Sequence, residues 1–130
     1  MAALSDYAEK LLLDFLMTTG TATRPTAWYV ALFTAAPNDT GGGTEVSAGG
    51  YTRKTVAFSA AASPGGTTSN SGEVSFTASG GNYGTVTHMG IFDASSSGNL
   101  LWHGALTASK AVADGDTLTF AAGNIDLTMA

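Results

Sequence analysis

From Pro25 onward, the chain alternates short β-type runs with segments rich in Gly, Ser and Asn. Residues 27–34 (AWYVALFT) are almost continuously apolar, aromatic or β-branched, which is typical of a central strand buried on both faces. About seven or eight such runs follow one another at regular spacing. This pattern predicts a mainly β fold over residues 26–129, either an antiparallel β-sandwich or an open barrel.

One helix is predicted before the strands, over residues 5–18. Ser5 is a favoured N-cap, and acidic residues in the first turn suit the positive end of the helix dipole. Leu13 and Met17 widen the apolar stripe beyond what a small core needs. We expect the stripe to cover one face of the sheet, with packing against a neighbouring subunit as the alternative. Its residues recur at helical spacing: Ala8, Leu11, Leu12, Phe15 and Leu16.

The length of 130 residues predicts a single domain, residues 1–130, comprising the helix and the β-region. Within the β-region, segments 36–50 and 60–72 contain turn-forming residues without periodicity, and we expect both to be exposed loops. Val74 and Phe76 alternate with polar residues and are expected to face the core.

Two hairpins are predicted. Residues 85–93 and 100–107 read as paired strands joined by a Ser-rich turn. Asp114–Gly115 is a strong two-residue turn signal, and it predicts a second hairpin between residues 111–112 and 117–120.

The first hairpin brings His88 and His103 opposite each other if its turn is centred between Ser95 and Ser96. The Cβ atoms of such neighbours lie about 5 Å apart. Two imidazoles could hold a metal ion, but a stable site normally needs further ligands, so we expect structural histidines instead. If the rings stack, protonation below roughly pH 6 would weaken subunit association.

The surface is expected to be poor in charge. Asp, Glu, Lys and Arg make up 12% of the chain, against roughly 25% in an ordinary soluble domain. Small hydroxyl residues lose little side-chain entropy at an interface, so this composition favours assembly with copies of the same chain. The net charge of −5 and the scattered basic residues exclude a nucleic-acid-binding face. The interface candidates are Leu12, Phe15, Leu16, Trp28, Tyr51, His88, Trp102 and His103.

Catalytic chemistry has no basis in the sequence. The chain has no cysteine and no Gly-x-Ser-x-Gly motif, and no set of nucleophile, base and orienting acid can be assembled. We therefore expect no enzyme activity, no cofactor and no metal. Acidic residues interrupt the N-terminal apolar run, and no stretch reaches the roughly 20 apolar residues that span a bilayer, so we expect no secretion signal and no membrane segment.

The sequence resembles a family of small tailed-bacteriophage structural proteins, whose members carry labels such as head decoration protein, minor structural protein and tail fibre protein. The resemblance covers nearly the whole chain and departs mildly at residues 80–83. It is carried by LSDYAEKLLLDFL (4–16), AWYVALFTAAPNDTGGGTEVSAGGYTR (27–53), YGTVTHMGIFDASSSGNLLWHGAL (83–106) and DGDTLTFAAGNIDLTM (114–129).

This resemblance implies a non-enzymatic component of the virion, made in the cytoplasm of the bacterial host. We expect a head decoration, or cement, protein that forms a homo-oligomer, a trimer, and clamps the major capsid protein. A tail fibre is the main alternative, although the chain shows no coiled-coil, collagen-like or β-helix repeat. A connector or tail-tube subunit, contacting a neighbouring tail protein, is a further alternative.

Overall fold

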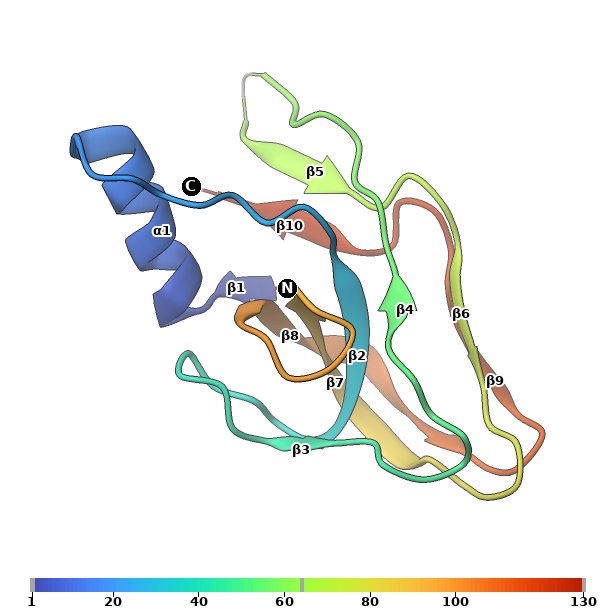
Figure 1. Ribbon diagram of the computed structural model, residues 1–130. Helices are drawn as coiled ribbons and strands as arrows, with labels where there is room; N and C mark the ends of the chain where they lie inside the picture. Colours follow the sequence, from blue (N-terminus) through green and yellow to red (C-terminus); the bar gives the residue numbers. More distant parts are fainter. Residues whose placement is uncertain (1, 64, 130) are drawn as a thin grey trace.

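The computed structural model describes residues 2–63 and 65–129, which form one helix and ten strands (Figure 1). In chain order, the elements are β1 (Ala2–Leu4), α1 (Asp6–Met17), β2 (Tyr29–Ala35), β3 (Thr44–Glu45), β4 (Lys54–Thr55), β5 (Thr67–Ser69), β6 (Val74–Thr77), β7 (Gly84–Phe92), β8 (Leu100–Val112), β9 (Thr117–Phe120) and β10 (Asp126–Thr128).

The strands form one large antiparallel sheet and two small ones. The large sheet runs in the order β1-β8-β7-β2-β3, and β4 also pairs with β2. The pairs β10-β5 and β6-β9 stand apart from this sheet (Figure 1). The predicted mainly β fold is confirmed as an open arrangement of antiparallel sheets, not a closed barrel. The structure has ten strands, more than the seven or eight predicted, because several strands of only two or three residues are present.

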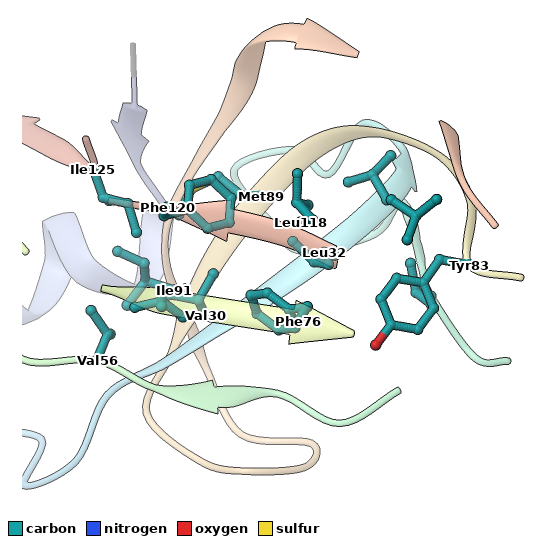
Figure 2. Close-up of a cluster of buried hydrophobic side chains, with 14 of the residues drawn as sticks. Val30, Leu32, Val56, Phe76, Tyr83, Met89, Ile91, Leu118, Phe120 and Ile125 are labelled. Atoms are coloured by element: carbon teal, nitrogen blue, oxygen red, sulfur yellow. The ribbon is translucent and has the colours of Figure 1, made fainter. Parts of the chain in front are cut away.

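The main hydrophobic core lies between the large sheet and the two strand pairs (Figure 2). Val30, Leu32 and Ile91 reach it from the large sheet, and each is at most 1% exposed. Val74 and Phe76 enter from the other side, as predicted. Each such side chain contributes roughly 1.5–3 kcal/mol when it leaves water, so this cluster is the principal source of stability.

A second, smaller group of buried residues lies outside this core. Because side chains alternate along β2, Ala31 and Phe33 point away from the core that Val30 and Leu32 enter. The Phe33 ring stacks on that of Phe92, with centroids 6.2 Å apart. The strand is therefore buried on both faces, as predicted for residues 27–34. The group consists of Ala8, Ala31, Phe33, Leu100 and Leu101.

Segment 36–50 is more ordered than expected. It contains β3, which pairs with β2, and the buried Val46. Gly49 has a φ of 67°, and a Cβ atom there would lie 2.8 Å from the carbonyl oxygen of Gly81. The prediction of an exposed loop is therefore wrong over residues 44–49, because contacts with distant parts of the chain fix this segment.

Segment 60–72 also departs from the prediction at its C-terminal end. Strand β5 pairs with β10, and Asn70 is 2% exposed. The Asn70 amide donates to the carbonyls of Gly72 and Ala121 and accepts from the Ile125 amide. A buried amide with these partners fixes the chain locally. The prediction is therefore wrong over residues 67–70, whereas residues 60–63, 65, 66, 71 and 72 are exposed as expected.

The second predicted hairpin is wrong in its pairing. Residues 113–116 do turn, with the Asp116 amide donating to the Ala113 carbonyl at 2.9 Å. Strand β9, however, pairs with β6 and not with β8. Hydrogen bonds between this turn and Ala78 direct the chain towards β6 (Ala78 N to Asp116 O, 2.9 Å; Gly115 N to Ala78 O, 2.8 Å).

One buried ion pair links β3 to the loop between β7 and β8. Arg53 donates to both carboxylate oxygens of Glu45, at 2.8 and 2.9 Å. It also donates to the carbonyls of Ala94 and Ser97, and its guanidinium carbon lies 3.7 Å from the centre of the Phe92 ring. The Arg53 side chain is only 7% exposed, so this bidentate pair lies largely out of water.

Tyr51 completes this cluster. Its hydroxyl donates to Glu45 at 2.7 Å and accepts from the amide of Leu32 at 3.0 Å. Burial, with the hydrogen bond to the carboxylate, raises the pKa of Tyr51 well above its ordinary value. Burial alone would raise the pKa of Glu45, but the hydrogen bonds from Arg53 and Tyr51 and the Arg53 charge hold that pKa below its ordinary value.

We predict that Glu45→Gln destabilises the fold by roughly 2 kcal/mol near pH 7, because Arg53 then loses its charged partner while still buried. The folded-state pKa of Glu45 lies below the ordinary 4.5, so its contribution is present above that pH and is lost as the pH falls through the folded value. Urea unfolding from about pH 7 to pH 3 should show the two proteins converging in acid. The exposed Glu73→Gln is the control, and a constant difference across this range would contradict the prediction.

Candidate functional site

The largest apolar side chains that the described part of the chain exposes are concentrated on α1. Six large hydrophobic residues are exposed, and five of them belong to this helix. We call these five the α1 patch: Tyr7 (40% exposed), Leu13 (61%), Phe15 (69%), Leu16 (67%) and Met17 (75%). A concentration of this kind on a small protein is a candidate interaction surface.

The last two turns of α1 are apolar on most sides. With 3.6 residues per turn, Phe15 lies on the same side as Ala8, whereas Leu13, Leu16 and Met17 lie on the remaining sides. Lys10 and Asp14 form an ion pair on the polar flank. A helix that is apolar nearly all round is normally enclosed by other protein, so a flat partner would leave part of the patch in water.

Hydrogen bonds to the body of the protein hold the helix at its N-terminal end. The Ser5 hydroxyl caps it by accepting from the Ala8 amide at 3.2 Å, and donates to the carbonyl of Leu100. The Ser5 amide donates to Leu101 at 2.9 Å, and the Asp6 amide donates to Asp39 at 2.9 Å. These bonds confirm the predicted N-cap and fix the first turn to the body of the protein.

Beyond the first turn, the expectation that the helix covers the sheet is wrong. Ala8 is its only buried residue among those described, and Leu11 and Leu12 are half-buried. Phe15, on the same side, has little protein beneath it because the helix extends past the edge of the sheet beside β1 (Figure 1). The sequence does indicate this exposure, because Leu13 and Met17 make the apolar stripe of the helix wider than the core requires.

The predicted opposition of His88 and His103 is wrong. His88 lies opposite Ala105 and His103 opposite Gly90, so the two histidines are diagonal neighbours. Next to the turn, Phe92 lies opposite Leu100, so the turn is centred on Ser96 and the pairing is already one residue out of the predicted register. An irregularity between Ile91 and Phe92 then shifts the register by one more residue. Each histidine has another partner: His88 Nδ1 lies 2.8 Å from the Thr87 hydroxyl and His103 Nε2 lies 2.8 Å from Asp39 Oδ1.

The remaining interface candidates belong to the body. Trp28 and Trp102 are half-buried and pack against the main core. Tyr51 also packs there, stacking on Phe76 with a centroid separation of 6.1 Å. The structure therefore brings Leu12, Phe15 and Leu16 together on one element, and the aromatic candidates occupy a different region.

The described residues offer no group of three or more His, Asp or Glu side chains arranged to hold a metal ion. Nor does any helix within residues 2–63 and 65–129 combine the length and hydropathy needed to cross a bilayer.

We predict that Ser5→Ala lowers the free energy of unfolding by about 1–2 kcal/mol and loosens α1 first, because the variant loses the cap and leaves the Leu100 carbonyl without its donor. Hydrogen exchange should show faster exchange over residues 6–17 than over β2. Ser109→Ala, at an exposed position of β8, serves as the control. Equal protection of α1 in the Ser5→Ala variant and in the parent protein would contradict the prediction.

Comparison with known proteins supports the phage resemblance. No curated protein shows significant similarity to the chain. Residues 3–128 match the family described as Podophage GP4 fiber I protein gp80, and this range includes α1, the Arg53 cluster and all strands from β2 to β10. The protein is therefore a member of this family of tailed-phage structural proteins.

Proposed function

We propose that the chain is a non-enzymatic fibre subunit of a phage particle, held in place through the α1 patch. The observation that carries this proposal is the exposure of four large side chains at 61–75% on one helix. Burying such a side chain contributes roughly 1.5–3 kcal/mol, so together they provide enough free energy for a specific contact. The family description, which names a fibre protein, supports the location.

The enzyme alternative has little support. The strongest polar cluster, formed by Arg53, Glu45 and Tyr51, is saturated by its own hydrogen bonds and binds loop carbonyls. Its role is to hold β3 and the β7–β8 loop together. The protein therefore acts through the surface that it buries on assembly.

Head decoration is the second candidate, and the shape of the body favours it. The described residues contain one 12-residue helix and ten strands of 2 to 13 residues in an open sandwich, which is not the repeated unit of a fibre shaft. A decoration protein, as a trimer, would use the same patch to contact its own copies and the major capsid protein. Both locations require the helix to be covered in the particle.

Copy number separates the two locations. Quantitative gel densitometry of purified virions should give a few copies per particle if the chain is a fibre subunit, whereas hundreds of copies would identify a shell or tube protein. Immunogold labelling should place a fibre subunit on the tail. Absence of the chain from intact virions would overturn both candidates.

We predict that the double substitution Phe15→Ser and Leu16→Ser abolishes incorporation into virions while leaving the body folded. Both side chains are largely in water in the isolated chain, so the stability cost should be the helix-propensity penalty, below about 1 kcal/mol for each. Circular dichroism melting and western blotting of purified particles check the two halves of the prediction. Lys10→Ser, on the polar flank of α1, is the matched control and should incorporate normally.

A further inference from the structure

The C-terminal end of α1 presents backbone carbonyls beside its apolar side chains. The last carbonyls of a helix have no partner within the helix. Here the Thr18 hydroxyl donates to the Asp14 carbonyl at 2.8 Å, and the Gly20 amide donates to the Thr18 hydroxyl instead of to the helix. Within residues 2–63 and 65–129, no backbone amide that follows the helix donates to the carbonyls of residues 15–17. These carbonyls face water, because this end of α1 projects beyond the sheet (Figure 1).

The charged side chains of α1 make the same surface more negative. The helix contains three acidic residues, Asp6, Glu9 and Asp14, and its one basic residue, Lys10, is paired with Asp14. Glu9 precedes Leu13 by four residues and so lies on the same side of the helix. The last turn has no basic residue, so nothing in α1 neutralises the negative end of the helix dipole.

A protein that covers the α1 patch must also satisfy these polar groups. A carbonyl that leaves water without gaining a hydrogen bond weakens the contact, and a negative charge that leaves water unpaired weakens it more. Arg and Lys side chains supply hydrogen-bond donors and a positive charge together, and neither adds an acceptor. The partner of the patch therefore needs an apolar surface with at least one Arg or Lys beside Met17.

The grooves of this protein lack that combination. The groove between β8 and the β9–β10 segment is lined by Asp126, and a second groove, beside the start of α1, is lined by Asp6 and Asp39. Neither has a Lys or Arg among its lining residues, and Arg53 is buried in its own ion pair. The net charge of −5 also makes copies of the chain repel each other. These charges favour a different protein as the partner of α1.

We propose that α1 docks into an apolar groove of a different virion protein, whose rim carries Arg or Lys where it receives the C-terminal end of the helix. The inference rests on the proposed function and deepens it, since it names the chemistry of the partner. The walls of such a groove enclose the apolar sides of the last two turns, as in other complexes of a helix with a groove. The basic side chain donates to the last carbonyls of α1 and neutralises the end of the dipole.

Thr19→Arg tests this chemistry, because its effects on the helix and on docking have opposite signs. Thr19 is exposed and lies just beyond the end of α1. A positive charge there stabilises the isolated helix, so the melting temperature should stay the same or rise. The same charge repels the basic rim of the partner, so we expect at least about fivefold lower incorporation into virions. Western blotting of particles from a phage deleted for the gene and supplied with each variant measures the incorporation.

Two controls isolate the charge and its position. Thr19→Gln lengthens the side chain without adding a charge, and it should incorporate like the parent protein. Thr55→Arg adds the same charge on the exposed β4, away from α1, and should also incorporate normally.

A second variant removes a negative charge instead of adding a positive one. Glu9→Gln changes the size of the side chain little, and we expect about two- to threefold lower incorporation, since one attraction to the basic rim is lost. Glu73→Gln, at an exposed position outside α1, is its control. This variant decides the question if Thr19→Arg lowers the melting temperature.

Normal incorporation of both α1 charge variants, or an equal loss in their controls, would overturn the proposal. Sedimentation velocity of the purified parent protein gives a further check, and we expect a monomer. Self-association that the Phe15→Ser and Leu16→Ser double variant abolishes would also overturn it, because a second copy would then cover the patch. The proposed function would survive each of these results if that double variant still failed to enter virions.

Discussion

The bidentate contact between Arg53 and Glu45 helps to fix the position of α1 on the body. Arg53 binds the carbonyls of Ala94 and Ser97 and so fixes the loop that leads from β7 into β8. That loop places Leu100 and Leu101, whose carbonyls receive the hydroxyl and the amide of Ser5. A single buried guanidinium is thus connected, through one loop and one serine, to the start of α1.

This arrangement explains why the helix is fixed at one end and exposed at the other. The hydrogen bonds of Ser5 and the burial of Ala8 orient the first turn, and a helix is stiff enough to hold its later turns in the same direction. The patch is therefore presented as a rigid projection. A partner of the kind we propose would bind a helix whose backbone is already ordered, which reduces the entropy cost of binding.

The sequence pattern predicts correctly those elements that depend on residues close together in the chain. The Ser5 cap, the β2 run and the pairing of β7 with β8 all appear in the structure. The composition of segment 36–50 does not reveal its order, because its partners lie outside it: Arg53 binds Glu45, and the Ser79 amide donates to the carbonyl of Gly49. The predicted pairing of the histidines is wrong because the turn is displaced and a one-residue irregularity follows within the strand, and neither leaves a trace in the alternation of residues.

The sequence pattern of α1 likewise predicts the helix but not what contacts it. Its periodicity predicted an apolar stripe, and the excess width of that stripe was visible in Leu13 and Met17, but periodicity does not reveal what covers a stripe. The segments that carry the family resemblance include most of α1 (within residues 4–16) as well as β2, the Arg53 cluster and β7 in the body. Within the described residues, the buried polar side chains of the body all have hydrogen-bond partners. In contrast, α1 keeps four large apolar side chains 61–75% exposed. Our proposal is that assembly in the particle, in a fibre or on a shell, removes these side chains from water.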